Sequence, residues 1–233
     1  MEQLRCAVLI SGAGRTLKNL LDCQDNGRLK NVTFPLIISS SPAATGLQYA
    51  SRCGAGAEIV DRKEYDSDES FSDAIYKLID LHKCNFIILA GFMRKLTIRP
   101  DFENRAVNIH PSLIPSFCGP GYYGMKVHQA AIDCGVKVSG CTVHFVTNQV
   151  DDGPIILQKT VPVYDNDDSA ALAARVLEME FQALPEALEL IAARSITVVG
   201  RRVIANSHNY TGSSGNCVPN GFEQDSPFTD LTD

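Results

Sequence analysis

Hydrophobic residues follow two different patterns along the first half of the chain. Short aliphatic runs predict buried strands, at residues 6–10, 34–40, 57–60, 86–90 and 106–110. Between these runs lie longer stretches whose apolar residues recur at helical spacing, as Leu17, Leu20 and Leu21 do in the first. Strands that alternate with helices in this way predict βαβ units and a mainly parallel sheet.

The second half of the chain has a different pattern. Two strand-like runs, 141–146 and 154–163, are separated by only a short polar loop, so we expect them to pair antiparallel. A long helix is predicted from about residue 169 to 193, and residues 196–205 are typical of a small hairpin around Gly200. The predicted fold class is therefore α/β: a Rossmann-like open, mostly parallel sheet with flanking helices, and antiparallel strands added in the second half.

Composition limits the domain count and the kinds of partner. The chain has 233 residues, enough to bury a core without disulfides or metal, and we expect a single domain over 1–205. Residues 206–233 are rich in Ser, Asn, Gly and Asp and contain no Lys or Arg, which predicts a disordered acidic tail. The formal charge is −6, yet outside this tail the chain is nearly neutral, which excludes the basic stripe of a nucleic-acid-binding protein.

Cysteine usage and hydropathy indicate the compartment. The eight cysteines are scattered singly, without C-x-x-C pairs or Cys/His clusters at ligand spacing, so we expect reduced cysteines and no metal site. The sequence shows neither a signal peptide nor an apolar run of about 18 residues. We therefore expect a cytoplasmic protein that does not bind or cross a membrane.

A glycine-rich turn, SGAGRTL, joins the first predicted strand to the first predicted helix. It contains Gly12 and Gly14 but lacks the third glycine of a dinucleotide-binding motif, and the second strand ends without the carboxylate that would bind a ribose. The absence of G-K-[ST] excludes a nucleoside-triphosphate loop. Two interpretations remain: a tight connection without a ligand, or a turn whose N–H groups, with Arg15 and Thr16, bind an anion at the helix N-terminus.

Two polar residues interrupt the apolar strand in VNIHPSLIPSF. Asn108 and His110 are two positions apart, so their side chains lie on the same face, and Pro111 then ends the pairing. Open α/β sheets bind their ligands at the carboxyl ends of strands, so the pair is a candidate site. The alternative is a buried histidine with a purely structural role.

A second polar stretch covers residues 140–158. His144 lies inside a predicted strand, and Asp151 and Asp152 follow in the loop before Gly153. Two carboxylates at such a place are either turn formers or, for one of them, a partner that faces His110.

Four segments together resemble the phosphoribosylglycinamide formyltransferases, folate-dependent enzymes of purine synthesis. They are SGAGRTLKNL, ILAGFMRKL, NIHPSLIPSF and GCTVHFVTNQVDDGPIILQ, and they occur in order over roughly residues 5–200. The resemblance implies the formyltransferase fold, with a phosphate-binding half at 1–105 and a catalytic and folate-binding half at 106–205. It also implies transfer of a formyl group from 10-formyltetrahydrofolate, as co-substrate, to the amine of glycinamide ribonucleotide in de novo purine biosynthesis.

The family's motifs imply roles for individual residues of this chain. Asn108, His110 and Asp151 would be catalytic, and Asp151 rather than Asp152 matches the aspartate of the V-D-x-G motif. The residues implied for ribonucleotide binding are Gly12, Gly14, Arg15, Thr16 and Glu180. Those implied for folate binding are Phe92, Met93, Arg94, Leu96, Val146, Thr147 and Val150.

The chemistry of formyl transfer explains why such groups are needed. A neutral amine attacks the formamide carbon, and the tetrahedral intermediate carries an oxyanion that preorganised donors stabilise. We expect Asn108 and His110 to be these donors, and Asp151 to hold His110 and relay a proton between the amine and the leaving nitrogen. No covalent enzyme intermediate is required.

The chain also departs from the family. Asp68 stands where the family commonly has a phosphate-binding arginine, for which Arg62 or Lys63 could substitute, and Asn148 stands where an acidic residue is frequent. The segment 118–131 is longer than in some relatives. Two other functions stay open: a formyltetrahydrofolate hydrolase, with water in place of the amine, or a non-catalytic folate- or nucleotide-binding module. Monomer and homodimer are both compatible with the sequence.

Overall fold

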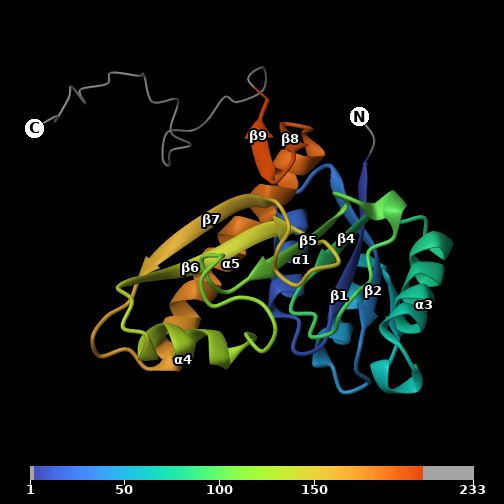
Figure 1. Ribbon diagram of the computed structural model, residues 1–233. Coiled ribbons are helices and arrows are strands. Elements are labelled where there is room, and N and C mark those ends of the chain that lie inside the picture. The colour runs from blue at the N-terminus through green and yellow to red at the C-terminus, as the bar shows by residue number, and fades with distance from the viewer. Residues whose placement is uncertain (1–2, 207–233) are drawn as a thin grey trace, which may run out of the picture.

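The computed structural model describes residues 3–206, and within them nine strands form one mixed sheet (Figure 1). The strands are β1 Leu4–Ile10, β2 Val32–Ser39, β3 Gly56–Ile59, β4 Phe86–Leu89, β5 Ala106–His110, β6 Val138–Phe145, β7 Ile155–Pro162, β8 Ile196–Val199 and β9 Arg202–Ala205. Their order across the sheet is β3-β2-β1-β4-β5-β6-β7-β9-β8.

Strand directions change at β5. The strands from β3 to β5 pair in parallel, as the alternation with helices predicts. β5 pairs antiparallel with β6, and β6 antiparallel with β7, so the predicted antiparallel pair is confirmed. The hairpin around Gly200 is confirmed as β8 and β9, and β9 joins the sheet beside β7.

Within residues 3–206, five helices connect and flank these strands. They are α1 Arg15–Asp25, α2 Ala50–Cys53, α3 Asp68–Leu81, α4 Met125–Asp133 and α5 Ser169–Ala192, with short 3-10 turns η1 Thr45–Tyr49, η2 Arg62–Glu64 and η3 Pro100–Phe102. The long helix predicted near 169–193 is therefore confirmed. The predicted acidic tail falls almost entirely on residues 207–233, which lie outside the described part of the chain.

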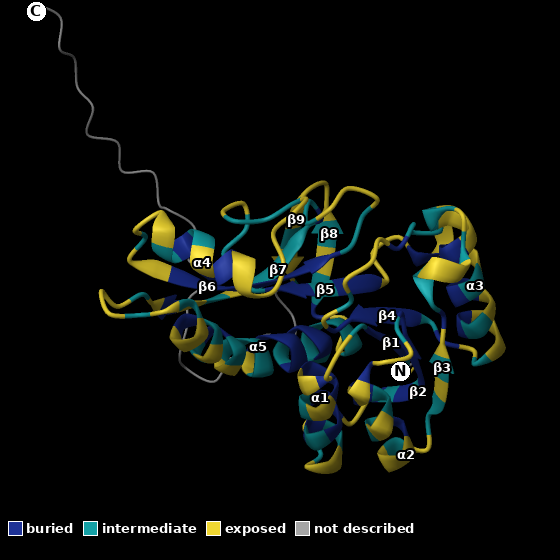
Figure 2. Cartoon of the chain, turned by 90° about the horizontal axis from the view of Figure 1, so that it is seen from below, coloured by how far each residue is buried: buried dark blue, intermediate teal, exposed yellow. Residues whose placement is uncertain are grey.

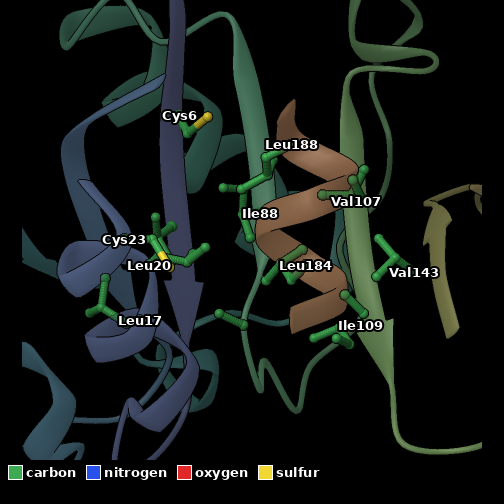
Figure 3. Packing of buried hydrophobic residues seen from close by; sticks show 14 of the residues in the cluster. Cys6, Leu17, Leu20, Cys23, Ile88, Val107, Ile109, Val143, Leu184 and Leu188 are labelled. Atoms are coloured by element: carbon green, nitrogen blue, oxygen red, sulfur yellow. The ribbon is translucent and has the colours of Figure 1, made fainter. Parts of the chain in front are cut away.

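The sheet separates two hydrophobic clusters because successive strand residues point to opposite faces. On β1, Val8 and Ile10 pack with α1 and α5, and Figure 3 shows Leu184 and Leu188 of α5 against this side of the strands. Leu9 packs on the other face with α3. We call these the α5 face and the α3 face. In Figure 2 the buried strands lie between helices whose outer surfaces are exposed.

β1 and β4 are neighbours in the sheet, but the chain leaves them in opposite directions. From β1 it passes through α1 to β2, on one side of the pair, and from β4 it passes to β5, on the other side. Two neighbouring strands whose connections leave in opposite directions form a switch point, where open α/β sheets bind ligands. The loops after β1 and β4 both open there. In residues 3–206 no helix is long and apolar enough to cross a membrane.

Candidate active site

The polar pair of β5 points toward the α3 face. Val107 and Ile109 pack into the α5-face cluster, so Asn108 and His110, at the alternate positions, project to the other side. His110 is buried, with 4% of its surface exposed. The antiparallel register between β5 and β6 sets His144 directly opposite Asn108, which places a second histidine in the site.

Both ring nitrogens of His110 face oxygen atoms. Nε2 lies 2.9 Å from the carbonyl oxygen of Phe117, which can only accept, so Nε2 carries a proton. Nδ1 lies 3.5 Å from Oδ2 of Asp151. These two contacts orient the ring with Nδ1 toward Asp151. Because Nε2 is already hydrogen-bonded to Phe117, Nδ1 is the ring nitrogen available for proton transfer.

Asp151, and not Asp152, faces His110. The Asp151 backbone has a φ of 54°, and its Oδ2 accepts the backbone N–H of Gly119 at 2.9 Å. Asp152 turns away and forms a bidentate pair with Arg201 of the β8–β9 hairpin, at 2.8 and 2.9 Å. The two adjacent carboxylates thus have different surroundings, and only the first belongs to the candidate site.

His144 is a site residue to which the sequence assigned no role. Its Nδ1 lies 2.8 Å from the carbonyl oxygen of Phe145 and therefore carries a proton, while burial lowers the pKa of the ring and keeps it neutral. Nε2 is then an acceptor, and Nδ2 of Asn108 lies 3.3 Å away. The sequence signal for this contact is weak, because it depends on the register between two strands.

A third histidine, His128 on α4, lies close to the same centre. It is 5% exposed, and Nδ1 has no hydrogen-bond partner among the described residues. Burial, and the neighbouring His110, lower its pKa to about 4. His128 is therefore a neutral ring at physiological pH.

The glycine turn after β1 packs closely against another glycine, Gly46 of η1. Gly14 has a φ of 68°, and a Cβ on it would lie 2.7 Å from the Cα of Gly46. The N–H of Gly46 donates to the carbonyl oxygen of Gly12 at 3.1 Å. Gly14 is the N-cap of α1 and provides no side-chain cap, Arg15 is exposed, and Thr16 is buried. The structure thus provides the open helix N-terminus that an anion would need.

Glu180 on α5 lies within electrostatic reach of Arg15. Burial raises the pKa of the Glu180 carboxyl to about 7, and the charge of Arg15 partly opposes this. Next to it, the carbonyl oxygen of Phe181 accepts the side-chain amide of Asn19 on α1, at 2.9 Å. The helices that carry Arg15 and Glu180 are therefore tied together.

The segments assigned to folate lie on the α3 face. Phe92 and Val146 pack against the α3-face cluster and Leu96 is buried in it, whereas Met93 and Val150 are about half exposed. The side-chain oxygen of Asn148 accepts the N–H of Ile98 at 2.7 Å and so joins the two segments. Arg94 is exposed and Thr147 is half-buried.

The departures around Asp68 also have a structural account. Nε of Arg62 donates to Asp68 at 3.0 Å, and the guanidinium also donates to the carbonyl oxygen of Tyr65 at 2.6 Å. The same guanidinium lies over the ring of Phe71, 5.9 Å from its centroid, and Phe71 stacks on Phe92. Asp68 and Arg62 are therefore partners, and they lie on the folate side of the sheet rather than beside α1.

The profile of a family described as formyl transferase matches residues 4–188 of the chain. The chain belongs to the formyl transferase family. Among the residues that the structure describes, no group of His, Cys, Asp and Glu side chains could hold a metal ion.

Two proteins are similar to this chain over most of its length. It is 34% identical over 184 residues to phosphoribosylglycinamide formyltransferase of Escherichia coli, covering 78% of this chain and 84% of that protein. It is 38% identical over 201 residues to the trifunctional purine biosynthetic protein adenosine-3 of Gallus gallus, covering 84% of this chain and 19% of that protein. The chain thus spans about a fifth of the length of that trifunctional relative.

The fold is the formyltransferase fold. Glycinamide ribonucleotide transformylase 1 from Symbiobacterium toebii superposes with a TM-score of 0.80 at 39% identity, covering 88% of this chain and 94% of that chain. Phosphoribosylglycinamide formyltransferase from Anaplasma phagocytophilum gives a TM-score of 0.78 at 34% identity, covering 89% and 96%.

Proposed function

We propose that the chain transfers the formyl group of 10-formyltetrahydrofolate to the amine of glycinamide ribonucleotide. One observation carries this proposal: Asn108, His110 and Asp151 gather at the carboxyl end of β5, which is flanked by the strands that lead into the two folate-side loops, β4 and β6. Two solved structures of similar fold are named glycinamide ribonucleotide transformylase and phosphoribosylglycinamide formyltransferase. The transfer needs no metal ion.

The ribonucleotide would bind from the side of α1. Its 5′-phosphate lies at the turn Gly12–Thr16, where the helix N-terminus is uncapped and Arg15 adds a positive charge. Glu180 on α5 accepts hydrogen bonds from the ribose or the glycinamide. The substrate's amine then reaches over the edge of the sheet toward His110.

The folate would bind on the α3 face. The pterin contacts the loop Phe92–Leu96 and the loop Val146–Val150, whose exposed apolar side chains Met93 and Val150 provide a surface for a flat heterocycle. Arg94 lies exposed at the rim of this surface. Because Leu96 is buried in the core, it would contribute through its backbone.

Asn108 would donate to the developing oxyanion. Its amide has two N–H protons, and the neutral ring of His144 accepts one of them at 3.3 Å. The other is then directed to the candidate site, where the formyl oxygen would lie. His144 is in this account a positioning residue, since a wrongly turned amide would offer an acceptor where a donor is needed.

His110 and Asp151 would carry out the proton transfers of the reaction. In the protonated ring, Nδ1–H can donate both to Asp151 and to the oxyanion, because Nε2–H is held by Phe117. Oδ1 of Asp151 lies 3.8 Å from Nε2 of His144, which carries no proton when that ring is neutral. This oxygen remains free to take the proton that the amine loses on attack.

Asp152 provides a matched control for the test. The assay follows folate deformylation by absorbance, with and without glycinamide ribonucleotide. We expect Asp151→Asn to fold normally and to lose roughly 10³-fold in kcat, and Asn108→Ala to lose roughly 10²–10³-fold. Asp152→Asn should keep near-normal turnover, because Asp152 faces Arg201 instead of the site.

The same assay separates the competing functions. Turnover that needs the ribonucleotide supports the transferase. Deformylation of equal rate without it would identify a hydrolase, and no turnover in either case would identify a binding module. Near-normal turnover of Asp151→Asn would remove that residue from the mechanism.

We further propose a single domain over residues 1–205, acting as a monomer or homodimer in the cytoplasm. Seven cysteines lie in the described residues and all are free thiols, in keeping with a reducing compartment. A relative from Vigna unguiculata carries the description chloroplastic, so imaging of a tagged chain is the direct test of location.

A further inference from the structure

Ser11 follows directly after β1, and its atoms join three loops at the switch point between β1 and β4. The backbone N–H of Met93 donates to its Oγ at 2.8 Å. Oγ also lies 2.6 Å from the hydroxyl oxygen of Ser40, in the loop after β2. The N–H of Ser11 donates to the carbonyl oxygen of Gly91 at 3.1 Å. The glycine turn and the loop after β4 are therefore linked through one residue.

The donor and the acceptor in the hydrogen bond between Ser11 and Ser40 can be assigned from the other contacts of the two hydroxyls. Ser40 is 2% exposed, and its hydroxyl has no other hydrogen-bond partner among residues 3–206. Because a buried O–H without an acceptor is costly, Ser40 donates to Ser11. Ser11 then accepts two hydrogen bonds, one from Ser40 and one from Met93. Its oxygen is thus the acceptor for the backbone N–H of Met93, in the loop after β4.

This acceptor lies between the two segments assigned to the substrates. Gly12, the next residue, begins the turn proposed for the phosphate, and Met93 belongs to the loop proposed for the folate. Phe92 and Leu96 of this loop pack in the α3-face cluster, but Met93 itself is about half exposed, so little side-chain packing holds it. The hydrogen bond to Ser11 is the side-chain contact that fixes the Met93 backbone relative to β1.

We propose that Ser11 is a positioning residue that couples the two substrates, so that ribonucleotide bound at the glycine turn tightens folate binding at the loop after β4. Ordering of the turn by the phosphate fixes Ser11, and Ser11 fixes the Met93 N–H and the loop that follows. Coupling between sites is reciprocal, so folate must tighten ribonucleotide binding by the same factor. This inference rests on the proposed function.

The test measures the dissociation constant of tetrahydrofolate by calorimetry, with and without saturating glycinamide ribonucleotide. Tetrahydrofolate carries no formyl group, so no turnover occurs. We expect the ribonucleotide to tighten binding about 5-fold in the unmodified chain, and Ser11→Ala to bring this ratio close to one. Ser11→Thr keeps the hydroxyl and should keep the ratio.

Ser40→Ala is the matched control. It removes a hydroxyl of the same cluster but leaves the bond between Met93 and Ser11, so the ratio should persist. A structural role of Ser11 alone would weaken both ligands equally and leave the ratio unchanged. If Ser11→Ala does not fold, Ser11→Cys carries the same expectation, because a thiol sulfur is a weak acceptor.

The possible failures are distinguishable. A ratio in Ser11→Ala or Ser11→Cys equal to that of the unmodified chain overturns the coupling, as does a ratio of one in the unmodified chain. Either result leaves the proposed function intact if formyl transfer is normal. Absence of formyl transfer in the unmodified chain overturns the proposed function itself.

Discussion

Pro185 in the middle of α5 leaves the carbonyl oxygen of Phe181 without its helical partner. Proline has no N–H, so the bond from residue 185 to the carbonyl four residues earlier cannot form. Asn19 of α1 supplies the missing donor, at 2.9 Å. The two helices are thus joined by an interhelical hydrogen bond that exists because the intrahelical one is absent.

Asn19→Ala should therefore destabilise the fold. The substitution removes a partly buried hydrogen bond and leaves the carbonyl of Phe181 unpaired, which together cost about 1.5 kcal/mol. At an m-value of roughly 3 kcal/mol per molar urea, the midpoint of unfolding moves down by about 0.5 M. The same change should weaken ribonucleotide binding, because Arg15 and Glu180 lie on the two helices that lose their link.

A double-mutant cycle with Pro185→Ala isolates the mechanism. Alanine restores the N–H of residue 185, so the carbonyl of Phe181 regains a helical donor and Asn19 is no longer needed for it. The cost of Asn19→Ala should fall by about 1 kcal/mol in the Pro185→Ala background. Asn26→Ala, at the exposed end of α1, is the control and should cost the same in both backgrounds. Equal costs of Asn19→Ala with and without Pro185 would refute the explanation.

Three further predictions concern His128, Gly14 and Glu180. The pKa of His128 is lowered to about 4, so the stability that its neutral ring contributes is complete above pH 6.5 and is lost as the pH falls toward 4. From pH 7 to pH 5 the free energy of unfolding of the unmodified chain should fall by about 2 kcal/mol more than that of His128→Gln. Equal losses in urea titrations of the two proteins would contradict this. Gly14→Ala should cost more than about 2 kcal/mol, measured by thermal unfolding, because it combines a left-handed φ with a clash against Gly46; normal stability would disprove that packing. The pKa of Glu180 is raised to about 7, so the stability cost of its charge is absent below pH 4.5 and complete above 7. The difference in free energy of unfolding between Glu180→Gln and the unmodified chain should therefore shift by roughly 1 kcal/mol in favour of the variant as the pH rises from 5 to 8, allowing for partial solvent screening. A difference that does not change with pH would exclude the charge as the cause.

The sequence was sufficient to predict those features that depend on local periodicity. The alternation of strands and helices, the antiparallel pair and the hairpin around Gly200 each follow from spacing within a short window. The placement of Asn108 and His110 on one face also follows, because only the two-residue period of a strand is needed. The choice of Asp151 over Asp152 came from the resemblance to a family, since the residues alone left both open.

The features that sequence could not provide all depend on long-range contacts. His144 meets Asn108 only through the register between β5 and β6. The pair of Asp152 and Arg201 requires the last hairpin to lie beside the loop after β6. The link from Asn19 to α5 requires two helices to pack side by side. No pattern within a window of 10 or 20 residues carries this information, because each contact is fixed by how separate elements pack.

The division of the sheet into two faces explains why the proposed catalytic residues are spaced as they are. β5 must be apolar at Val107 and Ile109, since these positions contact the cluster beneath α5. Only the alternate positions are free to carry polar groups, and both project to the α3 face. The glycine turn proposed to bind the phosphate belongs to the opposite side, with α1 and α5. The substrates of the proposed reaction would therefore approach from different faces and could meet only at the edge of the sheet, past the ends of β1 and β4. Ser11 lies at that edge, which is why a single hydroxyl can contact the loops of both.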